Sequence, residues 1–213
     1  SKYIFVTTAL SPYLQYSHGI YLQEQLEAGP VKLLLGIRQE YFTDILNYKT
    51  NKETRTTQHA FIPRIGAVVA INQNLNVYGT WVKGFEPQSA SVQGNPNTGG
   101  PFDPEYSQLF EAGLKGEWFD KRLSTTLSFF HLQKRNTLYN ANDPANPERL
   151  EQVGEETSKG IEMDIAGFIL PNWSIVANYA YTHAAITKTA TDSEKDFGMQ
   201  RPNTPRNAFN IWS

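Results

Sequence analysis

The residues that could do chemistry are scattered through this sequence rather than gathered in motifs. The four histidines, His18, His59, His131 and His183, lie far apart along the chain, and Cys is absent. Without Cys there is no disulfide framework, no thiolate metal site and no thiol nucleophile. No serine-hydrolase elbow, zinc-protease helix, phosphate loop or dinucleotide fingerprint appears. The sequence therefore predicts no enzyme and no metal ion held by protein ligands.

Composition narrows the class of protein further. The formal net charge is −2, so the basic excess expected of a nucleic-acid surface is missing. The mean hydropathy is −0.48, and no run of about 18 apolar residues could form a transmembrane helix. Aromatic residues make up 13% of the chain. That share suits the interfacial girdles of a membrane β-barrel, and it also occurs in soluble β proteins.

A hydrophobic period of two runs through most of the chain. Leu33 and Leu35 fall on one side of their segment and Lys32 on the other, and residues 123–130 and 173–182 alternate in the same way. This alternation predicts β-strands, whose successive side chains point to opposite faces of a sheet. No segment combines a helical period with helix caps.

The connections between these segments alternate in length. The short ones have the chemistry of tight turns, and they are Ala28–Pro30, Asn72–Asn74, Asp120–Lys121 and Pro171–Asn172. The long ones are polar, and they are Asp44–Gln58, Glu86–Tyr106, Asn140–Glu156 and Lys188–Pro205. A soluble sandwich has no reason to alternate in this way. An outer-membrane barrel does, because its periplasmic turns are short and its extracellular loops are long.

These patterns together predict an all-β, antiparallel, up-and-down transmembrane β-barrel segment of about nine strands. Val31–Thr43 and Arg122–Tyr139 are longer than the roughly 5–6 residues usual in soluble sheets. Single-chain bacterial barrels have an even number of strands, and strand-like sequence occurs at both ends, at Tyr3–Leu10 and Asn207–Trp212. We therefore expect residues 1–213 to be part of a longer barrel.

The alternation also predicts the facing of individual side chains. Those expected to face lipid are Leu33, Leu35, Ile37, Leu127, Phe129, Ile161, Met163 and Ile165. Those expected to face the barrel lumen are Lys32, Arg38, Glu40, Lys115, Glu117, Ser128, Glu162 and Asp164. Glu24 breaks the pattern, because it shares a side with Ile20 and Leu22 in the segment Gly19–Glu27.

Five groups of segments carry a family resemblance. They are Gly19–Gln25; Pro63–Gly66 with Asn74–Gly79 and Lys83–Gln88; Glu111–Phe119 with Arg122–Ser124; Gly154–Glu162 with Leu170–Trp173 and Tyr179–Thr182; and Pro205–Asn210. In this order they resemble TonB-dependent siderophore receptors, most closely those of the ferrichrome and hydroxamate type. The resemblance covers most of the chain.

The resemblance implies a barrel of about 22 strands that holds an N-terminal plug domain. It implies a monomer in the outer membrane of a Gram-negative bacterium, surrounded by lipid, that imports ferric siderophores with energy supplied through TonB. No plug, TonB-binding segment or closing strand is evident in residues 1–213. We therefore expect a partial barrel domain that does not transport by itself. The iron would need no protein ligand, because the siderophore fills its coordination sphere.

Recognition of such a chelate would fall to aromatic and hydrogen-bonding side chains at the extracellular mouth. The candidates are Tyr48, Phe85, Gln88, Phe102, Tyr106 and Tyr139. The alternative for each is membership of the outer aromatic girdle or packing between loops. Two alternative functions also stay open. One is a non-transport β protein, either a soluble sandwich or a structural surface barrel, and the other is TonB-dependent import of cobalamin, haem or a glycan.

Overall fold

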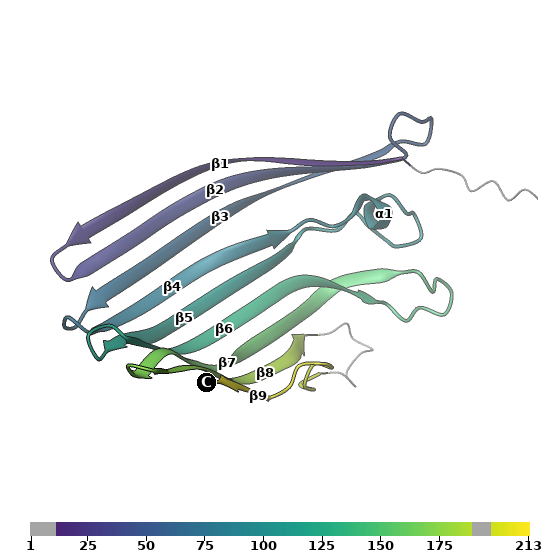
Figure 1. Cartoon of the computed structure of the whole chain (residues 1–213). Helices are drawn as coiled ribbons and strands as arrows, with labels where there is room; N and C mark the ends of the chain where they lie inside the picture. The colour runs from purple at the N-terminus through teal and green to yellow at the C-terminus, as the bar shows by residue number, and fades with distance from the viewer. Residues whose placement is uncertain (1–11, 189–196) are drawn as a thin grey trace, which may run out of the picture.

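The computed structural model describes residues 12–188 and 197–213. These residues form one nine-stranded antiparallel sheet in which every strand pairs with its neighbours in the sequence (Figure 1). The strands are β1 (Tyr13–Ala28), β2 (Val31–Leu46), β3 (Thr54–Ala70), β4 (Leu75–Glu86), β5 (Glu105–Trp118), β6 (Leu123–Asn140), β7 (Leu150–Leu170), β8 (Trp173–Lys188) and β9 (Asn207–Trp212). The predicted meander is confirmed, and the strand expected at Tyr3–Leu10 lies outside the described residues.

The only helix in the described part of the chain is α1 (Ala90–Gln93), a single turn within the connection between β4 and β5. No described helix has the length and apolar character needed to cross a membrane. The strands are long: β1 and β2 have 16 residues each and β7 has 21. Sixteen residues of strand extend about 50 Å, well beyond the roughly 30 Å hydrocarbon core of a bilayer.

The four predicted short turns all lie on one edge of the sheet, which we call the short-turn rim. This follows from the topology, because each joins an odd-numbered strand to the next in an antiparallel meander. Gly29 has φ +57°, in the left-handed region that the β1–β2 turn requires. In the β3–β4 turn the Asn72 side chain accepts a hydrogen bond from the Asn74 N–H at 2.8 Å. The other edge, the long-loop rim, carries the longer connections.

The sequence overestimated the lengths of two long connections. β2 continues to Leu46 and β3 begins at Thr54, so most of the polar stretch Asp44–Gln58 is strand. β7 likewise begins at Leu150, within the stretch Asn140–Glu156. The β2–β3 ladder pairs Asp44 with Thr56 in unbroken register. Backbone hydrogen bonds hold these strand ends together, and they form whether the side chains are polar or apolar.

The register sorts the side chains onto two faces. Residues that pair directly across an antiparallel ladder share a face, and one such row runs Leu33, Ala67, Gly79, Ala112, Phe129, Ile161, Tyr181. All the side chains predicted to face lipid fall on the face that carries this row, the apolar face. All those predicted to face the lumen fall on the other, the polar face.

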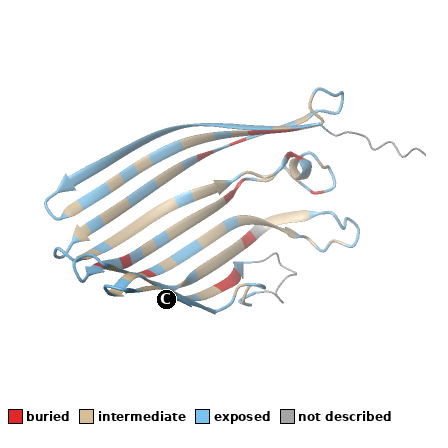
Figure 2. Ribbon diagram, viewed as in Figure 1, coloured by how far each residue is buried: buried red, intermediate tan, exposed pale blue. Residues whose placement is uncertain are grey.

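The apolar face is uncovered. Ile37 is 46% exposed, Phe110 50% and Phe129 50%, and exposed positions alternate with less exposed ones along the strands in Figure 2. A soluble sandwich would bury such a face against a second sheet. Glu24 also lies on the apolar face, opposite Leu35, and nothing in the described residues explains a carboxylate there.

We expect a charge on the apolar face to disturb membrane folding much more than a charge on the polar face. Leu127→Arg should lower the yield of folded full-length protein, since Arg at the lipid midplane of a barrel costs about 2–4 kcal/mol. Thr126→Arg is the matched control, because Thr126 is the adjacent residue on the polar face and pairs with Lys115 and Asp164. Ser128 is a poorer control, because it is only 5% exposed. Heat-modifiable gel mobility would measure the folded fraction, and equal losses for the two variants would contradict the assignment of faces.

Candidate functional site at the long-loop rim

The most enclosed part of the molecule lies at the long-loop rim. The ladder between β3 and β4 covers only Arg64 to Ala70. Beyond it the two strands separate, and the β4–β5 connection with α1 folds against β2 and β3 (Figure 1). Ala90 of α1 is fully buried, and Ala60, on the polar face of β3, is 2% exposed. The connection therefore packs as a small core where the sheet has opened.

Two buried polar side chains hold this connection in place. Asp44 is 1% exposed, and its Oδ2 accepts a hydrogen bond from the Ala90 N–H at 2.6 Å. Gln58 accepts from the Gln88 N–H at 2.7 Å and donates to the Phe102 carbonyl at 3.2 Å. Asp44 and Gln58 both belong to the polar face. The β4–β5 connection is therefore fixed on the polar side of the sheet.

The β4–β5 connection is also bonded to the β6–β7 connection. The Leu150 N–H donates to the Thr98 carbonyl at 2.9 Å. The Asp103 N–H donates to Gln152 Oε1 at 2.7 Å, and Asn95 Nδ2 donates to Glu148 at 3.1 Å. The two connections therefore form one hydrogen-bonded unit.

Hydrogen bonds to the Asp143 side chain stabilise the turn at the tip of the β6–β7 connection. Asn146 Nδ2 and the Ala145 N–H donate to the Asp143 carboxylate at 3.0 and 2.9 Å. These hydrogen bonds favour the ionised form and lower the pKa of the Asp143 carboxyl. The turn at the tip is thereby held by a carboxylate that is charged at neutral pH.

Tyr139 extends the bonded rim toward β8 and β9. A register shift between Arg135 and Thr137 reorients the end of β6. The Tyr139 ring then lies over Gly154, where an added Cβ would stand 2.1 Å from the ring. The Tyr139 hydroxyl donates to Glu156 Oε1 at 3.0 Å, and Arg201 lies 3.3 Å from the same oxygen. Glu156 is on the polar face, so this cluster also faces the polar side.

A cavity of about 580 Å³ lies between the long-loop end of β3 and the β4–β5 connection. Its lining mixes polar and apolar groups, and it is formed by residues 54–59 and 101–104 together with Gln93 and Tyr106. Among the described residues no three His, Cys, Asp or Glu side chains are grouped to hold a metal ion. The mixture of Thr, Gln, Phe and Tyr suits an organic ligand with several hydrogen-bonding groups.

The structure divides the predicted contact residues into four groups. Gln88 and Phe102 come together in the anchored connection, and Tyr139 joins the polar-face cluster with Glu156. Tyr48 stands apart in the β2–β3 connection, with the Lys49 ammonium 5.1 Å from its ring centroid.

Phe85 and Tyr106 pair with each other, with ring centroids 6.2 Å apart. The register places both on the apolar face, although Tyr106 also borders the cavity.

The sequence did not single out the anchors Asp44, Gln58 and Gln152. All three fall within stretches expected to be loops. One signal was present for the first two: continued period-two alternation places Asp44 and Gln58 on the face of Arg38 and Arg64. No sequence pattern indicates the role of Gln152, because its hydrogen bonds join it to a segment 49 residues away in the chain.

The wall below the rim is polar and internally paired. The residues predicted for the lumen wall, Arg38, Glu40, Lys115, Glu117, Glu162 and Asp164, all lie on the polar face. Arg38 pairs with Glu40, and Asn178 donates to Asp164 at 2.8 Å.

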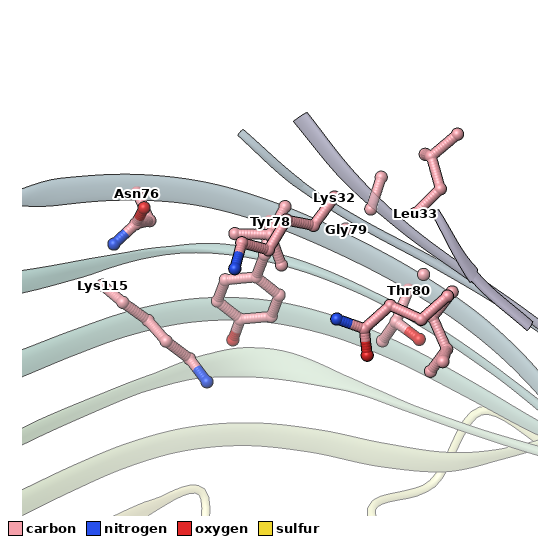
Figure 3. A pocket seen from close by; sticks show the side chains of 12 residues that line it. Lys32, Leu33, Asn76, Tyr78, Gly79, Thr80 and Lys115 are labelled. Atoms are coloured by element: carbon pink, nitrogen blue, oxygen red, sulfur yellow. The ribbon is translucent and has the colours of Figure 1, made fainter. Parts of the chain in front are cut away.

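Tyr78 lies on the polar face and contacts residues of the neighbouring strand β5. Its ring packs over Gly113, where an added Cβ would lie 2.8 Å from the ring. Its hydroxyl donates to Glu111 at 2.7 Å, and the Lys115 ammonium lies 4.8 Å from its ring centroid. Figure 3 shows Tyr78 and Lys115 at a shallow cavity of about 270 Å³ on this wall.

Comparison with known proteins decides the family. Residues 6–213 match the family described as "TonB dependent receptor-like, beta-barrel". The chain belongs to this family. The match agrees with the resemblance seen in the sequence and with the expectation that the chain is not an enzyme.

Named relatives are receptors for metal chelates. The chain is 33% identical over 198 residues to the metal-pseudopaline receptor CntO of Pseudomonas aeruginosa, covering 89% of this chain and 27% of that protein. It is 27% identical over 206 residues to the ferric-pyoverdine M114 receptor PbuA of a Pseudomonas species, covering 92% and 24%. The chain thus spans about a quarter of the length of these relatives.

Solved structures share the fold. The ferric-catecholate import receptor Fiu of Escherichia coli superposes with a TM-score of 0.79 at 21% identity, over 95% of this chain and 32% of that one. The siderophore receptor PiuA of Acinetobacter baumannii gives a TM-score of 0.79 at 24% identity, over 94% and 31%. These structures share the fold with the chain, and neither they nor the named relatives show a ferrichrome or hydroxamate type.

We expect Gln58→Ala to release the β4–β5 connection. The variant loses the acceptor for the part-buried Gln88 N–H, and leaving such a group unsatisfied costs about 1–3 kcal/mol. It also loses one of the two donors to the Phe102 carbonyl, which keeps the hydrogen bond from Gln93 Nε2 at 2.6 Å. In the full-length protein, limited proteolysis should cut residues 94–101 faster while the barrel stays folded. Thr56→Ala is the control, because it lies on the same face of β3. Equal cleavage of both variants would contradict the anchoring role.

Proposed function

We propose that the complete protein is an outer-membrane receptor of a Gram-negative bacterium that imports ferric siderophores with energy supplied through TonB. The observation that carries the proposal is the bonded long-loop rim on the polar face of a TonB-dependent receptor barrel. Relatives named for metal-pseudopaline, ferric-pyoverdine and siderophores support the substrate class. The whole activity belongs to a longer protein than this chain.

In this proposal the nine strands are one part of a barrel of about 22 strands around a plug. The polar face lines the lumen and the apolar face contacts outer-membrane lipid, and the protein works as a monomer. The short-turn rim is then periplasmic and the long-loop rim extracellular, as in other barrels of this kind. The plug and the TonB-binding segment would lie outside residues 1–213.

The substrate would be recognised as an organic surface. A siderophore already surrounds its iron, so the receptor would supply hydrogen bonds and aromatic contacts and no metal ligand. Gln88, Phe102 and Tyr139 are the candidates that the geometry favours. The connection that holds Gln88 and Phe102 lies on the polar side of the sheet, and Tyr139, near the end of β6, bonds Glu156 on the same face. Tyr48 is a more distant candidate on the neighbouring connection. Phe85 and Tyr106 fit the outer aromatic girdle better, because both lie on the apolar face.

The proposal also concerns which chemical type of siderophore the receptor binds. The sequence resemblance favours ferrichrome and other hydroxamates, whereas Fiu is named for catecholates and PbuA for a pyoverdine. An anchored rim is useful for any of them, because preorganised loops lose less conformational entropy on binding.

The test replaces pairs of residues from the two faces. Gln88→Ala with Phe102→Ala should weaken ferric-siderophore binding at least about tenfold, because an aromatic contact contributes roughly 0.5–1.5 kcal/mol beyond its buried area and about 1.4 kcal/mol is one decade. Phe110→Ala with Phe129→Ala is the control and should bind normally, because both side chains lie on the apolar face and neither borders the cavity between β3 and the β4–β5 connection. Uptake of radiolabelled iron by cells making each full-length variant would be measured with ferrichrome, another hydroxamate, a catecholate and a pyoverdine.

Two outcomes would count against this proposal. Normal uptake by the Gln88 and Phe102 double variant would remove these residues from the binding site. Failure of the unmodified receptor to import any ferric chelate would reject the siderophore substrate, and import of cobalamin, haem or a glycan would then be tested.

A further inference from the structure

The half of β3 nearest the long-loop rim has a free backbone edge. The β3–β4 ladder pairs only Arg64 to Ala70, so residues 54–63 of β3 pair with β2 and with no strand of the described sheet on their other side. The ladder ends at Pro63, which has no N–H to extend it. An unpaired strand edge presents a row of N–H and C=O groups with which another extended chain can pair.

Hydrogen bonds at the short-turn end of β3 show which residues direct their backbone groups to the free edge. The Ala70 N–H donates to the Pro30 carbonyl at 2.8 Å, on the β2 side, and the Ile71 N–H donates to the Leu75 carbonyl at 2.9 Å, on the β4 side. The direction alternates along an antiparallel strand, and the β2–β3 register is unbroken. The odd-numbered residues therefore direct N–H and C=O groups to the free edge, and these are Arg55, Thr57, His59 and Phe61.

The cavity of about 580 Å³ lies along this free edge. Its lining includes residues 54–59 of β3, from the polar face and the apolar face alike. A cavity that touches both faces of one strand lies in line with the sheet, in the place where a neighbouring strand would run. Residues 101–104 lie across the cavity, and no backbone hydrogen bond among the described residues joins them to β3.

The wall opposite the free edge offers side chains rather than a second ladder. Pro101 and Pro104 have no N–H, and the Phe102 N–H and carbonyl are both bonded to the Gln93 side chain, at 2.7 and 2.6 Å. Phe102 and Tyr106 add aromatic residues to the lining. A ligand in the cavity would therefore meet backbone donors and acceptors on the β3 side and mainly side chains on the other.

We infer that the free edge of β3 binds a ligand with a peptide backbone, which lies beside β3 as an added strand. Backbone groups on one side of an extended chain recur about every 7 Å, so the amides of an extended peptide match those of Arg55, Thr57 and His59. Main-chain hydrogen bonds of this kind give affinity when a peptide adds to a sheet edge. The inference rests on the proposed function and narrows it: the ferric siderophore carries its chelating groups on a linear peptide.

The size of the cavity favours a small ligand over a strand of another protein. Pockets for small molecules have volumes of about 300–1,000 Å³, and the cavity beside β3 falls within this range. The β4–β5 connection that closes its far side is held by the hydrogen bonds of Gln58. A few residues of peptide fit such a space.

The first measurement removes one donor from the free edge of the full-length receptor. Thr57→Pro loses an N–H that faces the cavity and no donor of the β2–β3 ladder, because odd-numbered residues of β3 face away from β2. Thr57→Val is the matched control, because it keeps the N–H and loses only the hydroxyl that bonds Thr43 at 3.2 Å. The probe is the ferric complex of a linear peptide with three hydroxamate side chains. Thr57→Pro should weaken its binding about three- to tenfold, the value of one net hydrogen bond, and Thr57→Val should bind as the unmodified receptor does.

The second measurement changes the ligand and leaves the receptor unmodified, so it does not depend on the folding of a variant. The same ferric peptide with methylated backbone nitrogens keeps its chelating groups and loses the donors to the C=O groups of β3. It should bind at least about tenfold more weakly, since two or more hydrogen bonds are lost. Heat-modifiable gel mobility would show that both Thr57 variants are folded.

Each result decides the inference. A preference for the unmethylated ferric peptide that Thr57→Pro reduces and Thr57→Val leaves intact supports it. Equal binding of the two ferric peptides, or equal binding by the two folded variants, overturns it. Equally tight binding of the metal-free peptide would replace the chelate with a peptide segment of a protein.

Uptake of radiolabelled iron separates this inference from the proposed function. Import of ferric chelates that have no peptide backbone, with no preference for the ferric peptide, would overturn the inference and leave the proposed function standing. Failure to import any ferric chelate, with tight binding of the metal-free peptide at the β3 edge, would reject the proposed function and the chelate as the ligand of this edge.

Discussion

The constraint on which the rest of this structure depends is the pairing of every strand's backbone with its neighbours. In hydrocarbon, an N–H or C=O group without a partner costs several kcal/mol, so only helices and closed β-ladders can cross a membrane. In the described sheet each strand from β2 to β8 pairs with a neighbour on both sides. Because the backbone supplies this cohesion, the side chains are free to suit the medium on each face. Leu33 and Lys32 can therefore be neighbours in the chain and face opposite media.

The functional features arise where that constraint is relaxed or changed. Beyond Arg64 the β3–β4 ladder ends, and side chains take over the task of satisfying backbone groups. Asp44 and Gln58 accept the N–H groups of the β4–β5 connection. Buried polar side chains are found at this rim because they form hydrogen bonds with loop backbone groups that have no partner strand.

Aromatic side chains occupy different roles according to the face on which they lie. Tyr78 and Tyr139 lie over glycines on the polar face, at Gly113 and Gly154, and present hydroxyls to Glu111 and Glu156. Glycine is needed there, because a Cβ would occupy the space of the ring. Phe85 and Tyr106 instead pair with each other on the apolar face. Proximity to a long loop in the sequence is thus a weaker guide to ligand contact than the face on which a residue sits.

The sequence by itself determined the strand class, the meander order, the short-turn rim and the facing of side chains such as Leu127 and Lys115. These follow from the period of two and from turn chemistry, which act between residues close in the chain. Only the tertiary structure decided where the strands end at the rim, which loops are bonded together and how Phe102 and Tyr106 differ. Those features depend on contacts such as Asp44 with Ala90 and Asp103 with Gln152, between segments 46 and 49 residues apart. Local periodicity carries no information about such contacts, because they form only when the ladder has brought distant strands side by side.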